Sequence, residues 1–469
     1  MIMLLLLAGG TAGIAIYYQQ RLRQQEITLQ SRIRSLSDEN EILARELQSM
    51  KVLMGKDAEQ RRIEKQVSSI RGLVFKKPVR YQRITRKELP AYLIQELRSE
   101  YTEQEFKQYL ESLAVMGFLP RDIDLEKLLV DLLGEQVAAF YDPKRGELFT
   151  FETFDLNRLS DQVIYAHEVT HALQDQNFDL NNSTPILKKD NDDRVMAAKA
   201  LIEGDATLLM NLYLMGNFDP VKFFSQDLFY MLGQPVEKLA SAPAYLRESL
   251  LFAYQQGQLF CGRLFDEGGF ARIDEAFHNL PESTEQILHP EKYLQKIDPP
   301  VEVSWPPLPI QGWEKIGDNV AGELGIRLLL AGELPAAQAN QAAEGWGGDR
   351  YQVYRVIAPD GRETRPRLPP SAASRGSTGS EKFAIVWWSL WDTEKDAREF
   401  FKAYTSLYVK RNGLLPVDQS GENNAVLLSC GGRQQSFVLK GKSVLILDVP
   451  ASKDAEALLN FLWQKKSEK

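Results

Sequence analysis

The sequence Tyr165-Ala166-His167-Glu168-Val169-Thr170-His171-Ala172-Leu173 places a glutamate between two histidines that are four positions apart. The helix predicted around this motif, from about Leu159 to Phe178, has apolar residues at helical spacing and contains neither proline nor glycine. On an α-helix, residues four positions apart lie on one face and about 6 Å apart along the axis. The two imidazole rings should therefore project from the same side of the helix.

This pair of histidines suits a tetrahedral Zn²⁺ site, to which each ring would supply one nitrogen. Glu168 would lie where it accepts a proton from a water molecule that the ion activates. The chain contains only four histidines, His167, His171, His278 and His289, so a chance pair at this spacing around a glutamate is rare. The alternative is an ordinary helix whose histidines make other hydrogen bonds. We predict a zinc site.

Glu203 is the predicted third ligand. It lies on a second long helix, predicted from about Arg194 to Met215, among mostly apolar residues. A carboxylate in such a place is costly to bury unless it is paired or binds a metal. The small residues Ala200 and Ala206 on either side would let this helix approach the motif helix closely.

Three other carboxylates, those of Asp175, Asp179 and Asp205, compete with Glu203. Asp175 is four residues beyond His171 and on the same face, but ligands at three successive turns would spread over about 12 Å and cannot meet one ion. Asp205 lies about 200° further round its helix than Glu203, so we expect it to face a different partner.

The motif together with Glu203 resembles the ligand set of the gluzincin branch of zinc metallopeptidases, over about residues 135 to 215. The resemblance implies a zinc-dependent peptidase. The gap between His171 and Glu203 is longer than in the familiar members. Thr207 stands four residues after Glu203, where those enzymes carry an aspartate. That departure leaves open which residue supports the ligand histidines.

A broader similarity extends through residue 351. Three segments carry it: Phe140-Tyr141-Asp142-Pro143, Glu203-Gly204-Asp205-Ala206 and Ser283-Thr284-Glu285-Gln286-Ile287-Leu288-His289-Pro290. In these segments the chain is similar to a group of bacterial membrane-anchored proteins with the same zincin motif. That similarity implies no known substrate.

Composition limits the remaining possibilities. The chain has 469 residues, which predicts two or three domains. Its net charge of −8 gives no electrostatic reason to expect nucleic acid as a partner. The only cysteines, Cys261 and Cys430, can form neither a disulfide framework nor a cysteine zinc site.

Residues 1–18 are predicted to form a transmembrane anchor or a signal segment. Ile2 to Tyr18 is uncharged, short for a spanning helix and long for a signal-peptide core. We favour an uncleaved single-pass anchor because a patterned helix follows without a break. Arginines after this run point to a cytoplasmic body by the positive-inside rule, whereas the resemblance suggests the opposite side. Our expectation is an extracytoplasmic catalytic domain.

Residues 19–55 are predicted to form a parallel coiled coil that makes the protein a homodimer. One heptad series comprises Leu22, Leu29, Leu36, Leu43 and Met50. A second series comprises Ile33, Asn40, Leu47 and Met54. Leucine at one core position with a single asparagine at the other favours two parallel strands. A lone amphipathic helix packed on its own domain is the alternative.

The expected fold class is α+β. A mainly helical zincin-like metallopeptidase domain with a small β-sheet (residues 70–298) would follow the transmembrane and coiled-coil stalk, and a smaller α+β domain (residues 310–469) would end the chain. Residues 74–133 are predicted to be helical, and the Gly/Trp-rich residues 345–351 to form a turn. A hairpin of Gln136–Tyr141 and Glu147–Phe151 precedes the motif helix. Its exposed strand either pairs with an extended peptide or lies inside a sheet, and the sequence leaves both open.

The function that these features predict is zinc-dependent peptide-bond hydrolysis of a peptide or protein substrate by an endopeptidase. His167, His171 and Glu203 would hold the ion, and Glu168 would act as general base. An oxyanion donor is also required, for which His289 and Tyr254 are the candidates. The alternative is a catalytically inactive, membrane-anchored zincin-like scaffold. The presence of all three ligands and the base argues against it.

Overall fold

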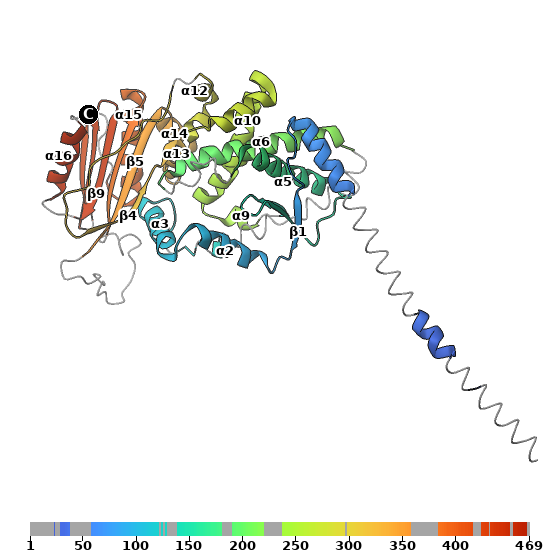
Figure 1. The fold of residues 1–469 in the computed structure, drawn as a ribbon. Coiled ribbons are helices and arrows are strands. Elements are labelled where there is room, and N and C mark those ends of the chain that lie inside the picture. The colour runs from blue at the N-terminus through green and yellow to red at the C-terminus, as the bar shows by residue number, and fades with distance from the viewer. Residues whose placement is uncertain are drawn as a thin grey trace, which may run out of the picture. The chain divides into compact units, whose positions relative to one another are not determined.

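The structure is a computed structural model (Figure 1). It describes residues 23, 29–37, 58–121, 123–124, 127–128, 138–180, 190–219, 237–295, 298–357, 383–415, 424–430, 432–450 and 454–466. By its internal contacts the chain divides into two units, Met1–Lys65 and Gln66–Lys469. In the first unit, residues 29–37 are helical and exposed.

A three-stranded sheet lies next to the motif helix. Its strands are β1 (Arg80–Ile84), β2 (Ala139–Asp142) and β3 (Glu147–Phe151), in the order β1-β3-β2. β1 runs parallel to β3, and β2 runs antiparallel to it as the predicted hairpin partner. Gly146 closes that hairpin in a left-handed conformation, with φ of 63°. In this order β2 is an edge strand, and it is the strand whose backbone contacts the motif helix.

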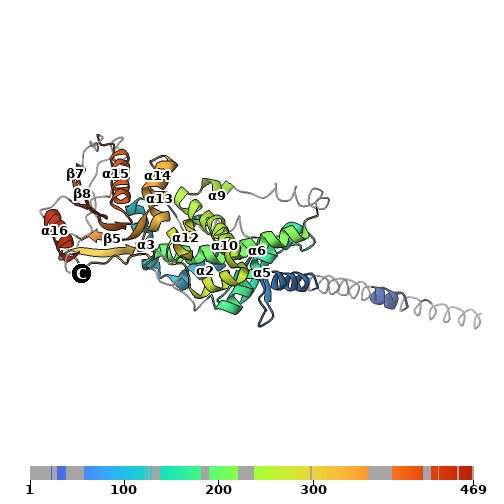
Figure 2. The same ribbon diagram turned by 90° about the horizontal axis from the view of Figure 1, so that it is seen from above.

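Three long helices form the region of the motif, and the first of them contains it. They are α5 (Leu159–Phe178), α6 (Asp192–Asn217) and α10 (Ala244–His278), the last of which is kinked at Gly268 and Gly269. α6 packs against both of the others (Figures 1 and 2). α5 has the predicted bounds, and it ends at Asp179, whose φ of 54° is left-handed. Asp179, one of the competing carboxylates, is thus the C-cap of the motif helix.

Glycines set how closely α6 and α10 cross. A Cβ atom added to Gly204 would lie 2.2 Å from the carbonyl carbon of Gly257, and one added to Gly257 would lie 2.1 Å from the carbonyl oxygen of Ala200. No side chain fits into that space, so only glycine permits the approach. Ala200 therefore lies against α10, whereas the sequence had suggested that it brings α6 close to the motif helix.

The larger sheet has six antiparallel strands in the order β4-β5-β6-β9-β8-β7. Their bounds are β4 Trp313–Asn319, β5 Trp346–Val356, β6 Phe383–Trp391, β7 Ala425–Cys430, β8 Arg433–Lys440 and β9 Ser443–Pro450. Side chains alternate between the two faces, as a strand requires. Ile385 and Trp387 of β6 belong to one buried cluster, whereas Val386 and Trp388 belong to another.

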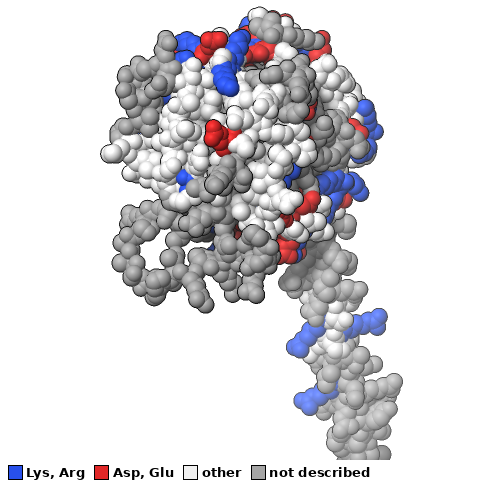
Figure 3. Space-filling model, turned by 90° about the vertical axis from the view of Figure 1, so that its left-hand side faces the viewer, with Lys and Arg blue, Asp and Glu red and all other residues white. Residues whose placement is uncertain are grey.

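Helices cover both faces of this sheet. On one side lie α13 (Gly322–Ala331), α14 (Ala336–Ala343) and α15 (Glu394–Arg411), and on the other lies α16 (Asp454–Lys466) (Figure 1). The remaining helices are α2 (Leu89–Glu100), α3 (Glu103–Met116), α9 (Glu237–Ser241), α11 (Thr284–Leu288) and α12 (Pro290–Leu294). Figure 3 views the molecule from the sheet end, where charged side chains lie mainly toward the margins of the described surface.

The fold class expected from the sequence is wrong. The chain is a mixed helix-and-sheet protein whose main sheet is six-stranded and antiparallel. Three strands were missed: β1, inside a region predicted to be helical, β4 at one edge of the larger sheet, and β5 beside it. Residues 345–351 were taken for a turn because of their glycines, yet β5 begins at Trp346. Position 348 accommodates only glycine because the backbone of Val301 runs beside it. The carbonyl oxygen of Val301 would lie 2.2 Å from a Cβ atom added to Gly348.

The expected stalk lies largely outside the described residues. Residues 1–18, the predicted transmembrane segment, are not among them, and of the predicted coiled coil only residues 23 and 29–37 are. Within the described part of the chain, no helix combines the length and apolar character needed to cross a membrane.

Candidate metal centre

α5 and α6 bring the three predicted ligands together. The Nε2 atoms of His167 and His171 lie 3.2 Å and 3.4 Å from Oε2 of Glu203. The two Nε2 atoms lie 3.1 Å from each other. Ligand atoms that are each about 2.0–2.1 Å from a tetrahedral ion are separated by about 3.3–3.4 Å. The donor set and its spacing therefore fit a zinc ion.

The charges of the cluster also suit a cation. Although burial by itself lowers the pKa of His171, the carboxylates of Glu203 and Glu168 beside it raise that pKa to about 9. Burial would raise the pKa of Glu203, but the two histidines lower it well below its ordinary value. Glu203 thus remains ionised, and positive charge is stabilised between the three side chains.

Glu168 lies beside the ligands without being one of them. Its Oε2 accepts a hydrogen bond of 2.9 Å from the backbone N–H of Tyr141 in β2. Burial raises the pKa of Glu168 despite the neighbouring histidines. The side chain of Tyr141 donates a hydrogen bond of 2.7 Å to Asp175. Tyr141 therefore ties the edge strand to α5 at two points, and it engages Asp175, the strongest competing ligand.

Tyr254, one of the two predicted oxyanion donors, lies at the cluster. Its ring stacks on His167, with centroids 5.9 Å apart and planes 28° apart. The charge of Glu203 raises the pKa of Tyr254, and burial and a hydrogen bond to Glu203 add to the shift. Tyr254 is one turn before Gly257, so the close crossing of α6 and α10 places it here.

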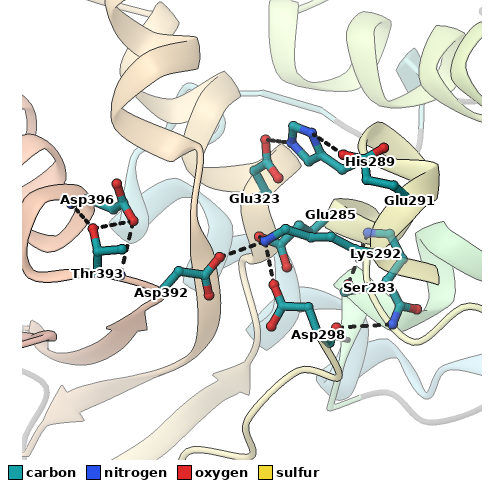
Figure 4. Close-up of polar contacts among 11 residues, drawn as sticks. Ser283, Glu285, His289, Glu291, Lys292, Asp298, Glu323, Asp392, Thr393 and Asp396 are labelled. Carbon is teal, nitrogen blue, oxygen red and sulfur yellow. Dashed lines mark hydrogen bonds and ion pairs between the residues drawn. The ribbon is translucent and has the colours of Figure 1, made fainter. Parts of the chain in front are cut away.

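His289, the other predicted donor, lies elsewhere. It stands between the end of α11 and the start of α12. Its Nε2 is 3.1 Å from Oε1 of Glu323, which belongs to α13 (Figure 4). Hydrogen bonding to Glu323 raises the pKa of His289. His289 is also absent from the residues that line the cavity beside Glu168. The structure thus brings Tyr254, but not His289, to the candidate ligands.

A cavity of about 540 Å³ opens beside His167 and Glu168. Its walls come from α5, α6, α9, α10 and β2, and they are largely apolar, with Ile164, Met210, Leu250 and Leu251 among them. Ala139 of the edge strand also lines it. The candidate ligands and base are therefore next to a space large enough for part of a substrate.

Sequence reasoning missed two residues at the site, Tyr141 and Gln174. Gln174 Oε1 lies 2.9 Å from Nδ1 of His171, the ring nitrogen that faces away from the cluster. A signal for Gln174 exists, since it is three residues after His171 on a predicted helix. No local pattern indicates Tyr141, because its contact with Glu168 joins a strand to a helix.

Comparisons with known proteins give one match. Residues 310–459 match the model of a domain of unknown function, DUF8575. This segment contains the six-stranded sheet and none of the candidate ligands. No curated protein and no solved structure matches the chain. The case for the metal centre therefore rests on its geometry.

Proposed function

We propose that the protein is a zinc-dependent peptidase. The observation that carries this proposal is the trio of His167, His171 and Glu203, whose ligand atoms lie 3.1–3.4 Å apart beside the carboxylate of Glu168. A zinc ion held there would activate a water molecule and polarise the carbonyl of the bond to be cleaved.

Glu168 has the position of a general base. Its carboxylate takes the proton from the attacking water and passes it to the leaving amine. The N–H of Tyr141 holds one carboxylate oxygen at 2.9 Å and so fixes the orientation of the group. Tyr254, next to His167, supplies a hydroxyl donor for the oxygen of the tetrahedral intermediate.

The outer edge of β2 supports a peptide as the substrate. The carbonyl of Ala138 accepts a hydrogen bond of 3.4 Å from the N–H of Phe151 in β3. Because polar groups alternate along a strand, those of Ala139 and Tyr141 face the other way. Tyr141 gives its N–H to Glu168, whereas Ala139 lines the cavity. An extended peptide could add to this edge through main-chain hydrogen bonds.

The cavity favours an apolar side chain beside the cleaved bond. Met210, Leu250 and Leu251 gain contacts when such a side chain displaces water from the space between them. We therefore expect cleavage next to aliphatic or aromatic residues, in segments that can adopt an extended conformation.

The proposal is tested by digestion of casein and of a peptide library with the purified full chain. Zinc content is measured on the same sample, and fragments are identified by mass spectrometry. Cleavage should stop when a chelator removes the ion and return when zinc is restored. A chain that holds zinc but cleaves nothing under any condition would support the scaffold alternative instead.

A further inference from the structure

Among the described residues, the second ring nitrogen of His171 has a hydrogen-bond partner and that of His167 has none. His171 Nδ1 lies 2.9 Å from Oε1 of Gln174. His167 Nδ1 is buried and makes no hydrogen bond to any described residue. Ligand histidines generally use their second ring nitrogen to hold the ring in place. Gln174 can hold the ring of His171 in place only if its own amide group is held in place.

The amide nitrogen of Gln174 has two oxygen acceptors. It lies 2.8 Å from Oδ2 of Asp205 and 3.0 Å from the carbonyl oxygen of Ile202. An oxygen in that place could not donate to either, so the amide must point its nitrogen toward α6. Its Oε1 then faces His171 and can only accept. In the neutral ring that binds a metal, His171 Nδ1 must therefore carry the proton, which leaves the lone pair on Nε2, the atom that faces Glu203.

Asp205 is itself fixed by a buried arginine. Nε of Arg71 lies 2.9 Å and 3.1 Å from the two carboxylate oxygens of Asp205. Arg71 also bonds Asp274 of α10 at 2.7 Å, and its guanidinium lies 4.7 Å from the ring centroid of Phe270. Arg71 is 1% exposed and Asp205 is fully buried. Arg71 is held between two carboxylates, those of Asp205 and Asp274, and its charge keeps the buried carboxylate of Asp205 beside it.

We propose that Arg71, Asp205 and Gln174 form a positioning chain that sets the tautomer and orientation of His171 for metal binding. The chain begins at Arg71, 134 positions before Asp205 in the sequence, and reaches the metal centre through one amide group. This inference rests on the proposed zinc site.

Gln174→Leu tests the proposed positioning by Arg71, Asp205 and Gln174, because it removes the amide and keeps a side chain of similar bulk. We expect the zinc dissociation constant of the full chain, measured by competition with a chromogenic chelator, to rise about 10- to 100-fold. The matched control is Gln162→Leu. Gln162 is also buried on α5, and it donates to the carbonyl of Leu156 at 2.7 Å and accepts from Tyr213 at 3.3 Å, away from the ligands. Both variants should lower the melting temperature of the metal-free chain, but only Gln174→Leu should weaken zinc binding.

A double variant, Gln174→Glu with Asp205→Asn, provides the rescue. It exchanges carboxylate and amide, so the new carboxylate still accepts from His171, and the new amide still donates to that carboxylate and accepts from Arg71. The new carboxylate cannot donate to the carbonyl of Ile202, as the amide of Gln174 does, so zinc affinity should recover only in part. The inference fails if Gln174→Leu binds zinc as tightly as the unaltered chain, if Gln162→Leu weakens binding equally, or if the double variant is no better than Gln174→Leu. Absence of zinc binding by the unaltered chain would overturn the proposed function itself.

Discussion

Two clusters in this protein each gather three groups that could hold a metal ion. One is His167, His171 and Glu203; the other, which we name the Lys292 cluster, is Glu285, Asp298 and Asp392 around Lys292. Lys292 Nζ lies 2.7 Å from Glu285 and from Asp392 and also bonds Asp298 (Figure 4). The second cluster thus contains its own cation, whereas the first leaves its ligand atoms facing one another at the spacing of an ion.

The surroundings of the two clusters also differ: those of the first suit a metal site, and those of the second suit a structural role. The histidine cluster lies beside a cavity and a general base. The Lys292 cluster joins α11, α12 and the residue that follows β6, so it holds the helical part of the chain to the sheet. Three acidic groups within reach of one another are therefore weak evidence for a metal until the neighbouring cations are known.

The largest effect is expected from Glu203→Ala. Loss of this carboxylate removes one of the three ligands, so zinc affinity should fall by more than the roughly 10- to 100-fold that loss of an outer partner costs. Cleavage should disappear with the metal. The measurement is zinc content after dialysis at nanomolar free zinc. Asp298→Ala, in the Lys292 cluster, is the control and should keep its zinc. Full zinc in Glu203→Ala would place the ligand elsewhere.

Glu168→Gln should separate metal binding from chemistry. The amide keeps the shape of the side chain but cannot take a proton, so cleavage should fall by about 10²- to 10⁴-fold while one zinc per chain remains. Initial rates of peptide cleavage and zinc content on one sample measure both. If zinc is lost together with activity, Glu168 is a ligand and not the base.

Tyr254→Phe should have a smaller effect on the same reaction. Removing the hydroxyl removes one donor to the developing oxyanion, and kcat should fall by about 10²- to 10³-fold, while KM and zinc content change little. His289→Asn is the informative comparison, because His289 faces Glu323 away from the cavity. A loss of kcat in His289→Asn but not in Tyr254→Phe would reverse our assignment of the donor.

Lys292→Met should destabilise the fold and leave zinc affinity unchanged. It leaves the carboxylates of the Lys292 cluster without their cation, and partial exposure of Asp298 and Asp392 moderates the cost to about 2–3 kcal/mol of unfolding free energy. Urea denaturation of the metal-free chain measures it. A weakened zinc site with unchanged stability would contradict the structural role that we assign to this cluster.

The last prediction concerns the pH dependence of stability. Burial raises the pKa of Glu285 to about 9, against an ordinary value of 4.5, despite the neighbouring Lys292. The folded chain therefore keeps a proton that the unfolded chain releases, and this group lowers stability as the pH rises from about 4.5 to 9. In Glu285→Gln, the melting temperature should decline less over that range than in the unaltered chain. An identical decline would show that Glu285 does not titrate as described.

Local patterns predicted the part of the site that lies on single helices. α5 runs from Leu159 to Phe178 as the apolar spacing indicated. The four-residue spacing of His167 and His171 fixed their common face, and the cost of burying a carboxylate singled out Glu203. Each of these inferences depends on residues within a few turns of one another, which is the range over which helix geometry acts.

Contacts between distant segments were beyond the sequence. β1 and β5 were missed because a strand is stabilised by partners that lie far away in the chain, and the glycines of β5 hide its pattern. The same holds for Tyr141, which meets Glu168 only because the hairpin packs on α5.

The sequence by itself determined the chemistry of this protein's candidate site: which side chains can bind zinc and which can take a proton. Only the tertiary structure decided how they are supported. The crossing at Gly204 and Gly257 brings Tyr254 to the ligands and leaves His289 outside. Packing also brings Arg71 behind Asp205. The reason is physical: residue type and helical spacing are local properties, whereas a buried hydrogen bond exists only after the chain has brought both partners together.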